Sequence, residues 1–325
     1  MSKLIENPKT YSGHELETIF FRPMLTGPSA MDLGIKVMYN MPMPTTLNFW
    51  RRSGDILQPY GAGWNGSKAA DRYQKSIDMS KVKAEIAYSA SDYFSMVFEL
   101  ITNRADVNLD DLSGTELEAA ETELFRQAIA ESIRATMWLG NTERTNGTLS
   151  TFNGLLKAIH NDRNEMTYST YTEDELMAEG YAEQLLRQVL ADAPEELRAL
   201  KSEGQLAFFC SSDIYAAYEN SLDSVVLDAA YEAKQNGRVG LSMRGIPVID
   251  LQLGKYSEQV SDLPSSFVIL TDRRNLALAV NTSDFPGTEI RMWYNPDEME
   301  NRQRAVFMAG CDYLLPELVS YAHIE

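Results

Sequence analysis

Apolar residues recur at helical spacing from residue 115 to residue 139, and this is the clearest secondary-structure signal in the chain. The apolar positions form two stripes, one of Leu117, Leu124, Ala128, Ala135 and Leu139 and another of Ile129, Ile133 and Met137. Ser113 and Glu116 make a capping box at the start, and Gly140 follows the last apolar position. The pattern predicts one long helix that is covered on more than one side.

Two strand-like runs precede this helix and flank a glycine-rich stretch. Residues 35–50 and 72–90 are rich in strand-forming residues, so we expect a long hairpin. Two prolines in the first run remove backbone donors, which suits an edge or free-standing strand. Apolar and polar residues alternate regularly only from Val82 onward, so we also expect a bulge or a break near Ser80.

The second half of the chain predicts a mixture of helices and strands. A helix is expected over 173–191, begun by Thr172 and ended before Pro194, and a short one over 212–224. Strands or strand pairs are expected within 204–212, 240–252, 265–281, 289–295 and 304–322. The chain shows no fixed-period repeat. This order of elements predicts an α+β fold.

Charge and composition restrict the function classes. Lys and Arg number 29 and Asp and Glu number 47, a net charge of −18, which disfavours direct recognition of a phosphate backbone. There is no charged-then-apolar leader and no apolar stretch of membrane-helix length, so we expect a cytoplasmic protein without a membrane partner. Cys210 and Cys311 each lie in an apolar run and are expected to be buried, reduced thiols, with "GCD" at 310–312 in a packed turn.

The glycines of "YGAGWNG" match the G-x-G-x-x-G pattern of a dinucleotide-binding loop. Gly61, Gly63 and Gly66 do not follow a buried strand, however, and no strand–helix alternation comes after them. The tip of a hairpin is the preferred interpretation, because glycine permits tight turns.

Other candidate chemistry is equally weak. His14, His160 and His323 have no metal-ligand spacing. The segment from Asp106 resembles the start of a calcium loop, but it lacks the turn glycine and the closing glutamate, so a weak cation site is only an alternative. No set of residues forms a catalytic constellation, and we expect neither an enzyme nor a cofactor or metal.

The order of elements and four apolar segments carry a resemblance. The segments are "FNGLLKAI" at 152–159, "MRGIPVID" at 243–250, "ILTDRRNLALAVN" at 269–281 and "RQRAVFMAGCDYLLPELVSYA" at 302–322. With them the chain resembles the major capsid proteins of tailed bacteriophages, which have the Hong Kong 97 fold. The resemblance implies a structural subunit of an icosahedral capsid, assembled from pentamers and hexamers around double-stranded DNA. An encapsulin-like shell around a cargo enzyme is the alternative on the same fold, and a soluble enzyme of unrelated fold is a third.

The same resemblance implies a division of the chain. It assigns residues 1–35 to an N-terminal arm, 36–84 to an extended E-loop, 85–160 and 288–325 to a P-domain with a spine helix at about 115–139, and 161–287 to an A-domain.

The implied partners are other copies of the chain, a separate scaffolding protein or a scaffolding segment missing from this sequence, a portal, decoration proteins, and packaged DNA held without sequence-specific contact. The expected location is the virion, after assembly in the bacterial cytoplasm. Rigid side chains on the predicted hairpin are the candidates for contacts between subunits: Phe49, Trp50, Arg51, Arg52, Tyr60 and Trp64.

Overall fold

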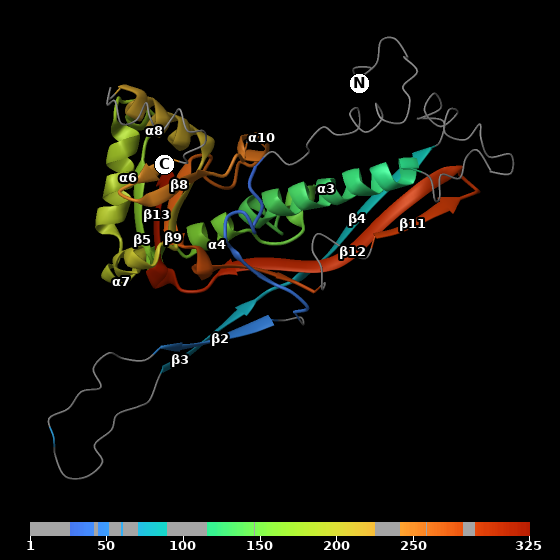
Figure 1. The fold of residues 1–325 in the computed structure, drawn as a ribbon, viewed down its shortest axis with the longest axis horizontal. Coiled ribbons are helices and arrows are strands. Elements are labelled where there is room, and N and C mark those ends of the chain that lie inside the picture. Colours follow the sequence, from blue (N-terminus) through green and yellow to red (C-terminus); the bar gives the residue numbers. More distant parts are fainter. Residues whose placement is uncertain are drawn as a thin grey trace.

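The computed structural model describes residues 27–41, 45–51, 60, 71–89, 116–145, 147–224, 241–257, 259–281 and 290–325. One end of the molecule combines a sheet with several helices, a long sheet extends from it beneath a single long helix, and a hairpin projects away from both (Figure 1). The predicted α+β class is therefore confirmed.

The first sheet has six strands. In spatial order they are β5 (Thr167–Tyr171), β13 (Val319–Ile324), β9 (Phe267–Asp272), β6 (Leu206–Cys210), β8 (Ile246–Asp250) and β7 (Ser242–Met243). β6 and β9 are buried along their whole length, as continuous apolar runs predict for central strands. The helices α6 (Tyr181–Asp192) and α8 (Ser212–Ser224) pack with these strands in one apolar cluster, beside the short α7 (Glu195–Ala199).

The helix expected over 173–191 is two helices. Thr172 caps α5 (Glu173–Leu176): its side chain accepts from the Glu175 amide, and the Glu175 side chain accepts from the Thr172 amide. α6 starts only at Tyr181, after Gly180, which has a left-handed φ of 76°. The predicted start is confirmed, but the predicted continuity is wrong, because a left-handed residue cannot continue a right-handed helix.

The second sheet is organised by one long strand, β12 (Glu300–Tyr313). β4 (Ser80–Ser89) pairs with one edge of it, and β10 (Leu276–Val280) and β11 (Ile290–Asn295) follow each other along the opposite edge. Ala309 shows this directly, because it is paired with Val280 of β10 and also with Ser80 of β4. The short β1 (Lys36–Met38) adds in parallel to β10.

The strand–turn–strand predicted over 265–281 is confirmed, but its two strands belong to different sheets. β9 lies in the six-stranded sheet and β10 in the long sheet. The turn between them is a 3-10 turn at Arg273–Asn275, whose start is capped by the Asp272 side chain. This turn therefore carries the chain from one sheet to the other.

The long helix α3 (Glu116–Leu139) confirms the strongest sequence prediction; Ser113 of its expected capping box lies outside the described residues. Phe125, Ile129 and Ile133 pack with the inward face of the long sheet in the main core. Near its end, Ala135, Met137, Trp138 and Leu139 are all buried. The Trp138 ring lies 5.5 Å from that of Phe209 in β6, so the helix joins the cores of the two sheets.

A buried ion pair makes a second connection between α3 and the globular end. Arg134 lies 2.8 Å from Glu131 and donates to the Leu251 carbonyl at 2.7 Å. Tyr256 of α10 (Gly254–Ser257) donates to Glu131 at 3.0 Å. Because both charges have several partners, their burial does not leave an uncompensated charge.

Both cysteines are free and buried, as predicted. Burial raises the pKa of each thiol above its usual range, so both stay protonated and unreactive near neutrality. The turn expected at "GCD" is wrong, because Cys311 lies inside β12 and pairs with Leu278.

The junction between α3 and α4 (Leu155–Asn161) supplies a test of this packing. A Cβ on Gly140 would lie 2.2 Å from the Phe152 carbonyl oxygen, whereas one on Gly254 would meet nothing within 4 Å. Because backbone would have to move, we expect Gly140→Ala to lower the free energy of unfolding by about 1–3 kcal/mol and Gly254→Ala to leave it nearly unchanged. Denaturant unfolding of both variants measures this, and equal midpoints would contradict the described junction.

Candidate assembly surfaces

The projecting hairpin is the first candidate surface. β2 (Thr45–Arg51) and β3 (Asp71–Ile77) pair antiparallel, from Thr45 opposite Ile77 to Arg51 opposite Asp71, and form a two-stranded sheet of their own. The hairpin extends away from the rest of the molecule (Figure 1). The predicted hairpin is therefore confirmed for residues 45–51 and 71–77 only, because β1 and β4, within the two predicted runs, pair with the long sheet instead. The predicted break near Ser80 is the two-residue interval between β3 and β4.

The glycine motif lies in the connection of this hairpin. Gly61, Gly63 and Gly66 are outside the described residues, but the strands on either side of them are antiparallel to each other. A dinucleotide loop instead joins a buried strand to a helix that packs back on a parallel sheet. The pairing of β2 with β3 thus removes the support for nucleotide binding.

The base of the hairpin is anchored by a small apolar cluster. Ile77 and Met79 are buried with Met38 of β1 and with Ala277 and Ala279 of β10. At the same place the backbone runs against β12: a Cβ on Gly310 would lie 2.2 Å from the Asp78 carbonyl oxygen. A glycine is needed for so close an approach of two backbones.

Lys75 makes a polar connection just beyond this base. Its Nζ lies 3.2 Å from Asp312 Oδ1 and 3.5 Å from the ring centroid of Tyr313, both on β12. The Tyr313 hydroxyl in turn donates to Asp162. Burial raises the pKa of the Asp312 carboxyl, whereas the nearby Lys75 ammonium acts in the opposite direction and favours the charged form of Asp312. Together these contacts hold the hairpin in one direction relative to the long sheet.

The sequence-predicted contact residues lie along this hairpin as far as the structure describes them. Phe49, Trp50 and Arg51 are on β2, opposite Tyr73, Arg72 and Asp71. The Tyr60 side chain is fully exposed. Arg52 and Trp64 lie outside the described residues.

A second candidate surface, which the sequence did not reveal, is a groove of about 410 Å³ between α3 and β4. Its lining is mostly apolar and includes Val82, Ala84 and Ile86 of β4, Phe125, Ala128 and Ile129 of α3, and Phe307 of β12. Ala128, expected on a covered face of the helix, is only half-buried here. Ile86 is more than a third exposed, at 37%. Such an open apolar strip is typical of a contact surface.

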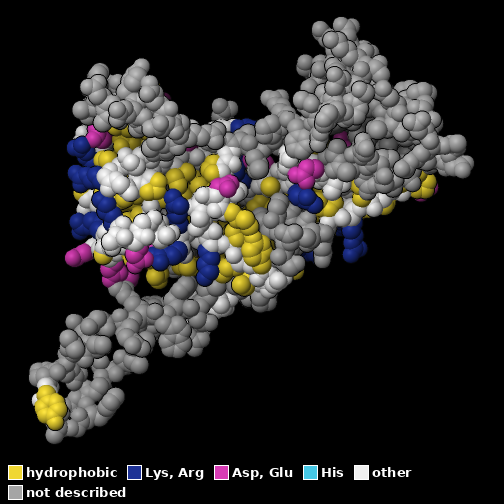
Figure 2. All heavy atoms as spheres, in the orientation of Figure 1, with side chains coloured by type: hydrophobic (Ala, Val, Ile, Leu, Met, Phe, Trp, Pro, Cys, Tyr) yellow, Lys and Arg dark blue, Asp and Glu magenta, His cyan; other side chains and the backbone are white. Residues whose placement is uncertain are grey.

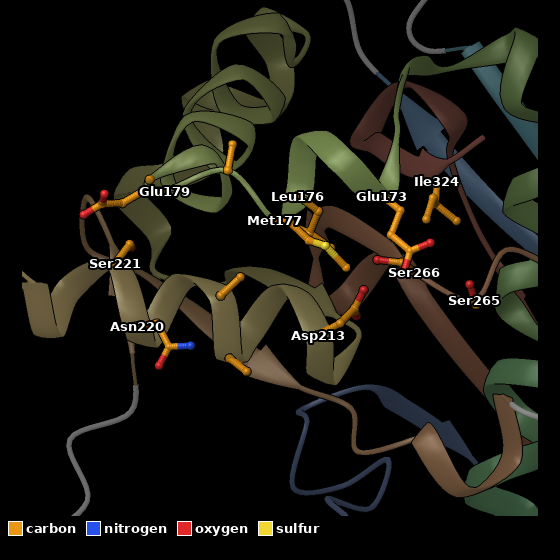
Figure 3. Close-up of a pocket in the computed structure, with 14 residues that line it drawn as sticks. Glu173, Leu176, Met177, Glu179, Asp213, Asn220, Ser221, Ser265, Ser266 and Ile324 are labelled. Carbon is orange, nitrogen blue, oxygen red and sulfur yellow. The ribbon is translucent and has the colours of Figure 1, made fainter.

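A cavity of about 540 Å³ lies at the globular end, between the α5–α6 connection and α8 (Figure 3). Glu173, Glu179 and Asp213 bring carboxylates to it, and Met177 contributes an exposed apolar side chain. The hydroxyl of Ser266 is 2.6 Å from that of Tyr171. Among the described lining residues there is no His, Cys, Lys or Arg that would activate a nucleophile.

The structure brings two of the three histidines together, which their sequence spacing did not suggest. The rings of His160 and His323 are 4.9 Å apart, and Tyr321 stacks on His323 at 4.9 Å. Burial, followed by the nearby His160, lowers the pKa of His323 to about 4. No group of three metal-ligating side chains occurs among the described residues, and His14 and the segment from Asp106 are not among these.

One face of the molecule shows basic and apolar side chains in different places. In the view of Figure 2, Lys and Arg side chains are scattered over the end that carries α6 and α7, and apolar side chains gather toward the middle. Within the part of the chain that the structure describes, no helix has the length and apolarity to cross a membrane.

Solved structures match this architecture over nearly the whole chain. A chain of the satellite phage P4 procapsid that includes the size determination (Sid) protein matches with a TM-score of 0.55 and 11% identity, over 96% of this chain and 99% of that one. The capsid of Myoviridae phage XM1 matches with a TM-score of 0.54 and 12% identity, over 91% of both chains. The capsid of a native GTA particle matches with a TM-score of 0.54 and 13% identity, over 99% and 96%. The chain has the fold of a phage capsid protein.

The predicted resemblance is thus confirmed at the level of the fold. No protein-family model and no curated protein sequence matches the chain, so the likeness rests on the three-dimensional arrangement. A fold can match where the sequence does not, because a core accepts many different apolar residues as long as burial is preserved.

The contacts of Lys75 generate a prediction about the hairpin base. Lys75→Met leaves Asp312, whose side chain is only 19% exposed, without its cation, and we expect a loss of about 1–3 kcal/mol in the free energy of unfolding. The matched control is Lys83→Met, which breaks an exposed pair with Glu85 and should change little. Thermal unfolding compares the two variants.

A second substitution separates the charge from the packing of the lysine stem. Asp312→Asn in the Lys75→Met background removes the unpaired carboxylate and should recover most of the lost stability. If Lys75→Met and Lys83→Met unfold alike, Lys75 does not anchor the hairpin.

Proposed function

We propose that this chain is the structural subunit of an icosahedral bacteriophage capsid, and that its copies form pentamers and hexamers in a closed shell around double-stranded DNA. The observation that carries the proposal is the match to capsid chains over more than nine tenths of both chains at TM-scores above 0.5.

The projecting hairpin supports self-assembly on physical grounds. A two-stranded sheet is marginal in water, and among the described residues it is the base of this one that packs in an apolar cluster. Another copy that covers the hairpin would supply the missing burial. The apolar groove between α3 and β4 is a surface of the kind that such a contact requires.

The proposed contact residues are those predicted on the hairpin: Phe49, Trp50, Arg51, Arg52, Tyr60 and Trp64. Tyr60 and Trp64 supply rigid apolar area, and the planar guanidinium groups of Arg51 and Arg52 suit carboxylates on an acidic neighbouring copy.

The proposed division of the subunit follows the sequence ranges with one adjustment. Residues 1–35 form an arm, 36–84 the E-loop, 85–160 and 288–325 the P-domain, and 161–287 the A-domain. Since β13 lies between β5 and β9, residues 319–324 are better assigned to the A-domain sheet. The described two-stranded sheet occupies the middle of the E-loop range, while β1 and β4 at its ends pair with the long sheet.

The further partners remain part of the proposal. They are a scaffolding protein, a portal, decoration proteins and packaged DNA held without sequence-specific contact, and the subunit acts in the virion after assembly in the host cytoplasm. A net charge of −18 suits a shell that confines DNA without binding it tightly. No chemical step is assigned to the subunit.

An encapsulin-like compartment is the less favoured function, because the matched structures described above are capsids of phages and of a GTA particle. The contents of purified shells distinguish the two functions. A phage capsid encloses nucleic acid in infected cells, whereas a compartment encloses a protein cargo.

The prediction that tests the proposal is a deletion of residues 55–70, the connection of the hairpin. Wild-type protein should form closed shells visible by negative-stain microscopy, whereas the deletion should stay a folded, unassembled subunit, because the described cores are built from residues outside this segment. Circular dichroism verifies folding and sedimentation measures assembly. A same-length Gly/Ser replacement of residues 55–70 controls for strand closure and should also fail to assemble. Closed shells of normal size from either variant would refute the assembly role of the hairpin.

A further inference from the structure

The outward face of the long sheet carries an unusual group of side chains. Along β12, Asn301, Gln303, Ala305 and Phe307 are buried, so the alternate residues Arg302, Arg304 and Val306 lie on the opposite face. α3 covers the buried face, as the contact of Gln303 with Thr122 at 3.3 Å shows. The outward face is therefore the one that no helix covers among the described elements (Figure 1).

Strand register identifies the neighbours on this outward face. Arg291 of β11 is directly opposite Arg304, and Trp293 is opposite Arg302. On the other edge, Glu85 of β4 is opposite Arg304, and Lys83 is opposite Val306. We call Arg291, Trp293, Arg302, Arg304 and Val306 the outer basic face.

The ion pairs on this face are incomplete. Arg304 shares Glu85 with Lys83, and Arg302 has Glu298 and Glu300. Arg291 contacts no carboxylate among the described residues. Like charges directly opposite in an antiparallel sheet destabilise it, so the placement of Arg291 beside Arg304 costs the isolated subunit free energy.

The outer basic face is also hollowed and partly apolar. Arg291, Trp293, Arg304 and Val306 line a depression of about 460 Å³. Trp293 is 41% exposed, which is unusual for so large an apolar side chain. Tryptophan and arginine together in a concave patch are the composition of a binding hot spot.

We propose that the outer basic face binds a carboxylate-bearing surface of a second copy of this chain, with Trp293 in the apolar centre of the contact and Arg291 paired to an acidic side chain of that copy. The inference rests on the proposed shell function and deepens it by naming a contact separate from the hairpin. Charge complementarity selects the partner: 47 acidic against 29 basic residues make every other copy a source of carboxylates.

A nucleic acid fits this face less well. Affinity for a phosphate backbone grows with the number of phosphates that cations neutralise, and here Glu85, Glu298 and Glu300 already take up the charge of the neighbouring cations. An exposed carboxylate between the cations would also repel a phosphate, whereas Trp293 favours a protein surface.

The test compares charge reversal on and off the face. Arg291→Glu should raise the critical concentration for shell assembly, measured by light scattering, at least about tenfold, because it reverses an attraction at every equivalent contact. The isolated subunit should keep or gain thermal stability, since the Arg291–Arg304 repulsion is removed. Arg198→Glu, the same change at an exposed arginine of α7, should leave the critical concentration unchanged.

Thiol labelling supplies a second, structural readout. Cys210 and Cys311 are buried, so the thiol introduced by Arg291→Cys can be followed against a low background. Its reaction with a maleimide should be at least about tenfold slower in purified, DNA-free shells than in subunits held below the critical concentration. The corresponding rate for Arg198→Cys shows how far assembly alone slows the reagent.

The outcomes separate this inference from the proposed function. If wild-type protein forms no shells, both fail. A different outcome is that wild-type shells form while Arg291→Glu assembles like wild type and the thiol at position 291 stays reactive in the shells. In that case only the outer basic face is refuted as a contact, and the proposed shell function stands. Protection that requires added DNA would assign the face to nucleic acid and overturn the inference as well.

Discussion

The structure depends on a projecting sheet that has two strands among the described residues, β2 and β3. Among the described strands, β2 and β3 pair with each other alone, and Ile77 and Met79 are buried where the hairpin meets β1 and β10. Backbone pairing alone does not hold such a ribbon in water. In the proposed shell, other copies that cover the hairpin would supply the burial that this sheet lacks in the isolated chain.

The body of the subunit is built to hold that hairpin in a fixed direction. β12 pairs with β4, β10 and β11, and it also supplies Gly310, Asp312 and Tyr313 to the hairpin base. α3 lies along the same sheet and connects it to the globular end through Trp138 and Arg134. β12 and α3 thus connect the base of the hairpin to both sheets.

Local patterns predicted the elements of this fold better than their arrangement. The 24-residue helix α3, the β2–β3 hairpin and the cap at Thr172 all depend on residues close in sequence, and all were predictable. The separation of β9 and β10 into two sheets depends on pairing with strands far away in the chain. The insertion of β13 between β5 and β9 depends on the same kind of pairing, and apolar periodicity does not report it.

The candidate surfaces likewise divide into one that local sequence predicted and others that depend on how distant elements are arranged. Aromatic and basic residues beside a glycine-rich tip pointed to the hairpin, because rigid side chains on a hairpin that is marginal in water indicate contact with another copy. The groove between α3 and β4 was not predictable, since its openness is set by how far a helix and a strand lie apart. The opposition of Arg291 and Arg304 was hidden for a related reason: it follows from the register between β11 and β12.

Amide hydrogen exchange of β2 and β3, in isolated subunits and in assembled shells, tests whether another copy completes the hairpin. If it does, amides of residues 45–51 and 71–76 exchange rapidly in the subunit and are strongly protected in the shell, while those of β6 and β9 are protected in both. Strong protection of the hairpin in the isolated subunit, or rapid exchange in the closed shell, would contradict the claim that another copy completes it.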